Sequence, residues 1–304
     1  MTDTNLPLVE QPDVDDRRGR PERGVRVVEV GPRDGLQNEA GFVPTPVKIA
    51  FIEALAAAGL PVVEATSFVN PKAVPQLADA GDVMRGVHRR SGVRYPVLVP
   101  NERGFDRALA AGVEAIALFT AATDAFARAN VGTSIDGTFA RFAPIADRAR
   151  DADIWVRGYV SVAFGCPYSG AVQPSAVIAV ASRLFALGCA EVSIADTIGV
   201  ANPTDVDHLL RHAGADLPLD RIALHFHDTN NRAVRNVAAG LQSGITSFDS
   251  AAGGLGGCPF APGAPGNLAT ETLVRFLEGQ GVETGVDAAA VAAAVATLHA
   301  TSGQ

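Results

Sequence analysis

The sequence lacks the features that mark several common classes of protein. Its 304 residues include only three cysteines, far apart and without a CxxC pair, so neither a disulfide scaffold nor a cysteine-rich zinc site is expected. The 25 lysines and arginines are outnumbered by 33 aspartates and glutamates, which leaves no broad basic surface for nucleic acid or an anionic membrane. No apolar run is long enough to cross a bilayer. These absences favour a protein of the reducing cytoplasm.

The chain divides into a tail and a large remainder. Residues 1–24 lack the apolar core of a signal peptide and hold too many acids for a transit peptide. We therefore expect a solvated, disordered tail at 1–24. The chain is 47% hydrophobic, enough for a large core. We expect one catalytic domain at 25–285, followed by a C-terminal helix at 286–304 that packs on it.

From residue 25 onward, β-rich segments alternate with longer alanine-rich segments of helical character. In residues 45–59, for example, Pro46 suits a first helical turn and Gly59 suits a C-terminal cap. A helix between every pair of strands implies a parallel sheet. Eight such units predict an α/β fold, a closed (β/α)8 TIM barrel, with a doubly wound open sheet as the alternative. The β-rich segments are 25–30, 61–67, 95–99, 114–119, 154–162, 190–195, 222–227 and 245–250.

The segment HFHDT, at 225–229, ends the seventh of these predicted strands. Period-2 alternation places His225 and His227 on the face opposite Ile222, Leu224 and Phe226. Two imidazoles at one strand end can point at one metal ion. The alternative is a pair of hydrogen-bonded interior histidines.

In a TIM barrel the active site lies at the C-terminal ends of the strands, and polar residues gather there in this sequence. Arg33 and Asp34 could instead form a local salt bridge, Glu64 could be an ion-pair partner inside the barrel, and Asp196 could cap a helix. Their shared location favours a functional site. The polar residues concerned are Arg33 and Asp34 in the segment 31–39, then Glu64, Thr66 and Ser67, Arg157, Tyr159 and Ser161, and Ser193 and Asp196, and the last predicted strand runs into the loop 253–267.

Several segments together resemble the 3-hydroxy-3-methylglutaryl-CoA lyase family, which belongs to a metal-dependent TIM-barrel superfamily of lyases and synthases. RDG and HxHD are shared across that superfamily, whereas RDGLQNE together with GGCPFAPGAPGN is specific to the lyases. The resemblance covers residues 25–285. The segments are VVEVGPRDGLQNE, VVEATSFVNPKAVPQLAD, VRGYVSVAFGCPYSG, VSIADTIGV, HFHDT and GGLGGCPFAPGAPGNLATE.

The resemblance implies a set of metal ligands. A divalent cation, Mg2+ or Mn2+, would be held by Asp34, His225, His227 and Asn267. A carboxylate, two imidazoles and an amide oxygen leave coordination positions for substrate oxygens. The implied partner is a small-molecule acyl-CoA substrate, a 3-hydroxyacyl thioester, and the chain is expected to form a homo-oligomer (dimer or tetramer).

The resemblance also implies a retro-aldol reaction that yields acetyl-CoA and acetoacetate. Arg33 would stabilise the enolate of acetyl-CoA, and Cys258 would protonate its carbon. The proton acceptor for the 3-hydroxyl is left open between Asp34, Glu64 and a metal-bound water. Gln37, Tyr159, Ser193 and Asp196 would contact the substrate or the catalytic residues.

Three cysteines have three different settings. Cys258 lies in a glycine- and proline-rich loop that is long enough to cover the barrel mouth, which favours a chemical role over that of a small buried side chain. Cys189 has apolar neighbours and suits the core, while Cys166, beside a turn, is left open. A nucleotide-binding interpretation of GGLGG fails because Pro259 stands where the third glycine belongs.

Other functions remain to be weighed against the lyase. After HFHDT the family commonly continues with an aromatic residue or arginine, a glycine and a small residue, whereas this chain has Asn230, Asn231 and Arg232. A longer-chain or citramalyl-type 3-hydroxyacyl-CoA is therefore an alternative substrate.

The alternative activities are a Claisen-condensing acyltransferase of the same superfamily and a metal-dependent hydrolase. A non-catalytic barrel would be expected to lack a ligand or Cys258, and none is missing.

Overall fold

The strands form a closed ring. The structure, a computed structural model, describes residues 24–39, 41–256 and 266–302. Over these residues every strand pairing in the main sheet is parallel, in the order β2-β1-β11-β10-β9-β6-β5-β4-β3. The strands are β1 (Arg26–Glu29), β2 (Val62–Val63), β3 (Thr66–Ser67), β4 (Val97–Leu98), β5 (Ala115–Ala121), β6 (Trp155–Ser161), β9 (Glu191–Asp196), β10 (Ile222–Phe226) and β11 (Ser247–Ser250).

The ring closes through one extended segment of chain. Strand β2 pairs with β1, and β3 pairs with β4. Between them, the Glu64 amide donates to Glu29 O on one side (2.8 Å), and the Ala65 amide donates to Pro96 O on the other (2.9 Å). The two ends of the strand order are therefore halves of one strand. This confirms the prediction of a closed (β/α)8 barrel, and the alternative prediction of a doubly wound open sheet is wrong.

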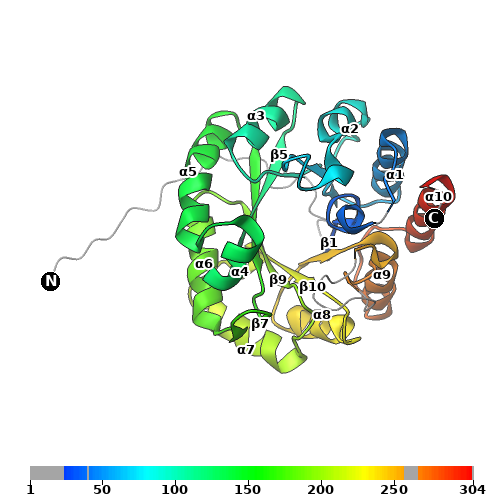
Figure 1. The fold of residues 1–304 in the computed structure, drawn as a ribbon. Coiled ribbons are helices and arrows are strands. Elements are labelled where there is room, and N and C mark those ends of the chain that lie inside the picture. The colour runs from blue at the N-terminus through cyan, green and yellow to red at the C-terminus, as the bar shows by residue number, and fades with distance from the viewer. Residues whose placement is uncertain (1–23, 40, 257–265, 303–304) are drawn as a thin grey trace.

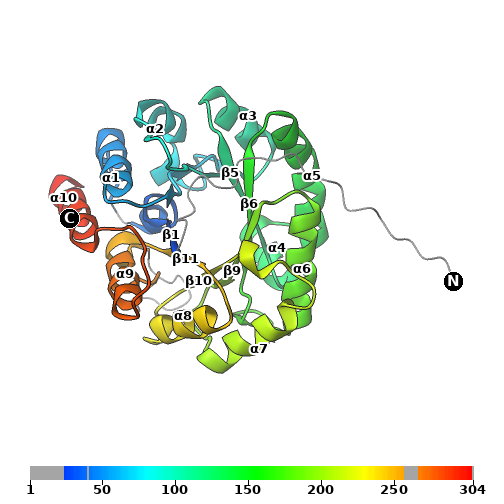
Figure 2. The ribbon, with the colours of Figure 1, turned by 180° about the vertical axis from the view of Figure 1, so that it is seen from behind.

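Helices surround the ring in chain order, with α1 beside the C-terminal helices (Figure 1). Figure 2 shows the same ring from behind, with β1 and β11 adjacent. The first and last helices meet because α10 packs against α1 and α9. The helices are α1 (Thr45–Ala57), α2 (Ala80–Gly86), α3 (Glu102–Ala110), α4 (Asp124–Val131), α5 (Ile135–Asp151), α6 (Pro174–Ala186), α7 (Pro203–Ala213), α8 (Ala233–Gln242), α9 (Thr270–Gly279) and α10 (Ala288–Ser302).

Local sequence accounts for where many of these helices begin. The side chains of Asn101, Thr123, Ser134 and Asn202 accept hydrogen bonds from backbone amides at the start of α3, α4, α5 and α7, as good N-caps do. Pro46 lies in the first turn of α1, as its sequence predicts. None of the helices within the described ranges is long and apolar enough to cross a membrane.

Two kinds of side chain fill the space on either side of the strands. Apolar residues such as Leu224 and Phe248 are fully buried against the helices. At Gly240 of α8, a Cβ would lie 2.7 Å from Leu224 Cδ1 and 3.0 Å from Phe248 Cε1, so only glycine lets α8 approach β10 and β11 this closely. The strand residues on the opposite face include buried charges, among them Arg157, whose side chain is 0% exposed.

Candidate active site

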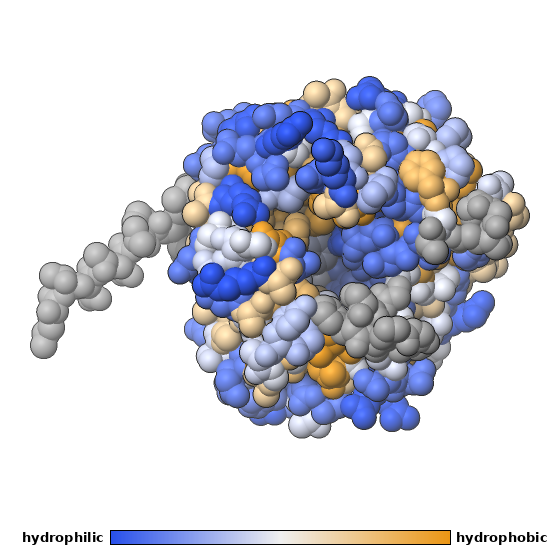
Figure 3. Space-filling model, in the orientation of Figure 1, coloured by the Kyte–Doolittle hydropathy of each residue, from blue (hydrophilic) through white to orange (hydrophobic). Residues whose placement is uncertain are grey.

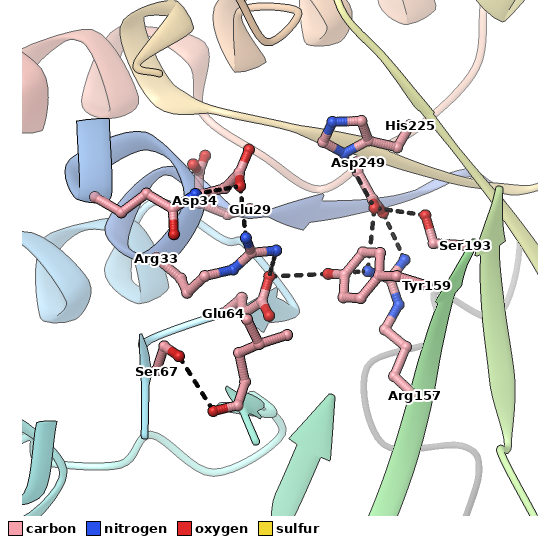
Figure 4. A network of polar contacts seen from close by, with 12 residues as sticks. Glu29, Arg33, Asp34, Glu64, Ser67, Arg157, Tyr159, Ser193, His225 and Asp249 are labelled. Carbon is pink, nitrogen blue, oxygen red and sulfur yellow. Dashed lines mark hydrogen bonds and ion pairs between the residues drawn. The ribbon is translucent and has the colours of Figure 1, made fainter. Parts of the chain in front are cut away.

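The Arg33–Asp34 pair lies on a widened turn directly after β1. Residues Gly31–Gly35 form a single π-helical turn, and the Gly35 amide reaches back to Val30 O (3.3 Å). Such turns occur frequently at functional sites, because the extra residue changes where side chains point. Figure 4 shows Arg33 and Asp34 beside Glu64 and the strand that carries His225. The face seen in Figure 1 is hollowed in the middle of the ring (Figure 3).

Glu29 anchors this turn to the last part of the barrel. Its Oε1 accepts hydrogen bonds from the amides of Gly31 and Ala252, both at 2.8 Å. The Thr270 hydroxyl donates to Oε2 (2.7 Å). Burial raises the pKa of Glu29 to about 7 despite these bonds. Glu29 therefore joins the turn after β1 to the stem of the loop after β11, a role that the sequence did not suggest.

A second group of polar residues forms a site with the composition of a metal centre. One ligand atom each from Asp34, His225 and His227 lie within 4.8 Å of one another. The Asn267 side-chain amide nitrogen donates to Asp34 Oδ2 and to Leu255 O, both at 3.0 Å. This orientation points the nitrogen of Asn267 at the protein and leaves its Oδ1 available. The predicted ligand residues are thus neighbours in space.

Asn267 reaches the histidines because its segment pairs with the end of β10. Residues His227 and Asn267 form an isolated antiparallel bridge. The supporting backbone hydrogen bonds run from the Asp228 amide to Gly266 O (2.7 Å) and from the Leu268 amide to Phe226 O (3.1 Å). The chain after the last strand therefore returns to the seventh strand and places an amide oxygen beside its histidines.

The charges at this site suit a divalent cation. Burial, and then the neighbouring His225, lowers the pKa of His227 to about 4, so its imidazole is neutral at pH 7. Burial alone would raise the pKa of Asp34, but Arg33 and the two histidines hold it below its ordinary value. Within the described ranges, His227 Nδ1 and Asn267 Oδ1 are buried and without a hydrogen-bond partner. The neutral imidazole of His227, a carboxylate and an unpaired amide oxygen fit a divalent ion.

Arg33 connects the candidate metal centre to Glu64. Its guanidinium donates to Asp34 Oδ1 (2.5 Å) through Nη1 and to Glu64 Oε2 (2.9 Å) through Nη2. Tyr159 donates its hydroxyl to the same Glu64 oxygen (2.8 Å), and Gln37 donates to Asp34 (3.2 Å). Figure 4 shows the bonds of Glu64. The local salt bridge and the interior ion pair considered for Arg33, Asp34 and Glu64 both exist, as parts of this network.

The other predicted site residues have different surroundings. Ser193 donates to Asp249 Oδ2 (2.8 Å). Asp196 accepts from the amides of Val200 (3.0 Å) and Ala201 (2.9 Å), which ties down the turn after β9. It does not cap α7, whose N-cap is Asn202. Burial raises the pKa of Asp196 to about 6. Cys258 lies outside the described residues.

The residues that depart from the family pattern lie in the loop between β10 and α8. Asn231 has φ 54°, a left-handed conformation that glycine adopts freely and asparagine tolerates better than most residues. Asn230 donates to Gly199 O (2.7 Å), which joins the loop after β10 to the loop after β9. Arg232, on the exposed surface, precedes α8. The positive φ of Asn231 thus suits the glycine that the family commonly has at this position.

Asp249, the partner of Arg157, is a functional candidate that sequence reasoning missed. Arg157 Nη2 donates to Asp249 Oδ1 (2.5 Å), and Asp249 Oδ2 lies 3.5 Å from His225 Nδ1. Burial would raise the pKa of Asp249, but Arg157 holds it well below its ordinary value. The only sequence signal for Asp249 was its position near the end of the last predicted strand. The sequence could not show that Asp249 lies in register with His225 on the neighbouring strand.

Comparisons with known proteins agree with this geometry. The HMGL-like family model matches residues 24–298. The mitochondrial hydroxymethylglutaryl-CoA lyase of Rattus norvegicus is 52% identical over 263 residues, which cover 86% of this chain and 81% of the relative. The crystal structure of the HMG-CoA lyase from Brucella melitensis superposes with a TM-score of 0.90 at 46% identity, over 93% of this chain and 100% of that one. An HMG-CoA lyase from Acinetobacter baumannii, in complex with coenzyme A and 3-methylmalate, superposes with a TM-score of 0.87 at 38% identity, over 92% of each chain.

Proposed function

This chain belongs to the HMGL-like family, and on that basis we propose that it cleaves 3-hydroxy-3-methylglutaryl-CoA to acetyl-CoA and acetoacetate. The observation that supports the proposal most strongly is the grouping of Asp34, His225 and His227 beside the Arg33–Glu64 pair. A metal-dependent hydrolase of the HxH type is disfavoured, because such enzymes carry that motif on their first strand, whereas here it ends β10. The solved lyase that holds coenzyme A supports an acyl-CoA substrate for this chain.

The proposed ion, Mg2+ or Mn2+, would be held by Asp34, His225, His227 and Asn267. When bound, it would supply Lewis acidity that makes the 3-hydroxyl of the substrate easier to deprotonate. We assign Glu64 as the acceptor of that proton. Arg33 and Tyr159 hold its Oε2, and its buried Oε1 has no hydrogen-bond partner among the described residues. Asp34 is a poorer acceptor, because its oxygens already accept bonds from Arg33, Gln37 and Asn267.

Cleavage of the bond between C2 and C3 follows loss of the hydroxyl proton. The electrons of the O–H bond form the carbonyl of acetoacetate, and those of the broken C–C bond stay on the acetyl-CoA fragment as an enolate. Its negative charge develops on the thioester oxygen, where we assign Arg33 as the stabilising cation. A proton then goes to C2, and Cys258 is the proposed donor. The proton that Glu64 takes and the one that Cys258 gives balance the reaction.

A panel of thioesters tests the activity. We expect the protein, loaded with Mg2+ or Mn2+, to cleave 3-hydroxy-3-methylglutaryl-CoA and release acetoacetate. Its kcat/KM for this thioester should be higher than for a citramalyl-type or longer-chain 3-hydroxyacyl-CoA. Product analysis by chromatography and mass spectrometry would measure this. A preference for one of the other thioesters would change the assigned substrate. Condensation of acetyl-CoA with a keto acid, without cleavage of any thioester, would make the chain a Claisen-type synthase. The cytoplasmic location and the homo-oligomeric state stay predictions.

Arg33→Ala tests the stabilising cation. Loss of a donor aimed at transition-state charge typically lowers turnover by ~10^2–10^3-fold, and we expect a fall in kcat of that size. Arg33→Lys keeps the charge but not the planar fork that reaches both Asp34 and Glu64, so it should also be slow. Steady-state kinetics would measure both variants, with circular dichroism and Mn2+ binding to verify that the site is assembled. A folded, metal-binding Arg33→Ala protein with wild-type kcat would remove Arg33 from the mechanism.

A further inference from the structure

Asp249 is a fully buried carboxylate that the proposed mechanism does not use. It lies on β11, in register with His225 on β10, and its side chain is 0% exposed. Arg157 holds it through Nη2 to Oδ1 (2.5 Å) and Nη1 to Oδ2 (3.1 Å). The Ser193 hydroxyl donates to Oδ2 as well (2.8 Å). Figure 4 shows this bidentate pair beneath the ring of His225. The carboxylate is thus fixed in place by neighbours that leave it negatively charged.

The same oxygen faces one nitrogen of the imidazole of His225. Asp249 Oδ2 lies 3.5 Å from His225 Nδ1. That nitrogen is buried and makes no hydrogen bond within the part of the chain that the structure describes. A carboxylate opposite one ring nitrogen favours the tautomer with its proton there, and the lone pair is then on the other nitrogen. For His225 that other nitrogen is Nε2.

We propose that Asp249, held by Arg157 and Ser193, is a positioning residue that keeps the proton of His225 on Nδ1 and presents Nε2 to the divalent ion. This inference rests on the proposed metal-dependent function and extends it to the Asp249–Arg157 pair. Without the carboxylate, the imidazole would for part of the time be the tautomer with its proton on Nε2. That tautomer has no lone pair on Nε2 with which to bind the ion. The pair would therefore raise the affinity for the ion without touching it.

The chain provides a matched control at the other end of the same arginine. Arg157 Nε donates to Glu191 Oε1 (2.6 Å), and Glu191 also pairs with Arg26. Glu191 is 3% exposed. Glu191→Gln therefore removes a buried charge from the Arg157 network, as Asp249→Asn does. In contrast to Asp249, Glu191 makes no hydrogen bond or ion pair with either histidine among the described residues, so a tautomer effect is expected from only one of the two variants.

The experiment compares Mn2+ binding by the wild-type chain, Asp249→Asn and Glu191→Gln, using titration calorimetry. An amide in place of a carboxylate behind an imidazole favours the wrong tautomer. We expect Asp249→Asn to bind Mn2+ ~10–100-fold more weakly, the usual cost of losing such a partner, and Glu191→Gln to bind with wild-type affinity. Unchanged affinity in a folded Asp249→Asn protein would overturn the proposal. Equal weakening in both variants would also overturn it, because the effect would then come from damage to the buried network.

A second measurement needs no variant. Nitrogen NMR of 15N-histidine-labelled wild-type protein, loaded with Mg2+, reports which ring nitrogen of His225 is protonated. We expect the proton on Nδ1, and a proton on Nε2 would overturn the proposal even if Asp249→Asn does not fold. A wild-type chain that binds Mn2+ in this Asp249-dependent way, but cleaves no thioester, would support the positioning role and refute the proposed activity. The two proposals can therefore fail separately.

Discussion

Removal of divalent ions from the purified protein should abolish cleavage of 3-hydroxy-3-methylglutaryl-CoA, and Mg2+ or Mn2+ should restore it. The reason lies in the ligand set, since Asp34, His225 and His227 converge and Asn267 turns its oxygen away from its own partners. Without the ion, the 3-hydroxyl would keep a pKa far above that of any carboxylate placed to deprotonate it. Coupled detection of acetoacetate before and after chelation would measure the loss and the recovery.

Two controls separate loss of the ion from loss of the fold. Circular dichroism should show the chelated protein still folded, with a lower unfolding midpoint because the ion binds only the native state. His225→Ala should weaken Mn2+ binding by at least ~10–100-fold, the usual cost of losing even a residue that only supports a metal ligand. His212→Ala, on the exposed surface of α7, should bind as wild type. Full activity in protein shown to be metal-free by elemental analysis would refute the metal-dependent mechanism.

Cys258→Ala should lower turnover by ~10^2–10^4-fold, the usual contribution of a general acid, while leaving the affinity for Mn2+ unchanged. The role rests on the resemblance of GGCPFAPGAPGN to the lyases. Gly256, the last described residue before that loop, accepts a hydrogen bond at its carbonyl from the backbone amide of Asn267 (3.3 Å), so it lies beside a proposed metal ligand. Rapid-quench measurement of a single turnover would isolate the chemical step.

The alternatives for Cys258 predict different results. A nucleophile would leave an acyl adduct on the cysteine, visible in the intact mass after quenching, whereas a proton donor leaves none. Cys189→Ala is a matched control, because Cys189 is buried and burial raises the pKa of its thiol to about 12. We expect that variant to lose stability but keep its turnover. A folded, metal-loaded Cys258→Ala protein that cleaves at the wild-type rate would move the proton donor to a metal-bound water.

The barrel could be predicted from the sequence because the alternation of strand and helix patterns along the chain determines most of its strand order. Each strand of the barrel pairs with the strands before and after it in the chain, apart from the closure of β1 on β11, so alternating segments suffice to predict the ring. The prediction of strand 95–99 was longer than the observed Val97–Leu98, and the segment contains Pro96, which has no amide to donate. The prediction that the sheet closes into a barrel depended on counting eight strand–helix units. An open sheet of the same length could contain eight units as well.

The site was predictable where one motif carries several of its residues. The HFHDT segment places His225 and His227 on one face of one strand, and their convergence follows from strand geometry. Asn267 entered only through the resemblance, because its proximity depends on a strand-like pairing after the barrel is closed. Asp249 was missed because its partner Arg157 is 92 residues away, and period-2 reasoning cannot pair residues on different strands.

The contact between Asp34 and Asn267 has a consequence for how the protein matures on the ribosome. The two side chains are hydrogen-bonded to each other but lie 233 residues apart in the chain. At ~5–20 residues per second, Asp34 is synthesised roughly 10–50 s before Asn267, so during that interval its carboxylate can bond to Arg33 and Gln37 but not to Asn267. A nascent chain can therefore form early βα units but cannot hold the proposed ion with all four proposed ligands. We expect capture of that ion to be a late event in biogenesis, after translation has passed the last strand.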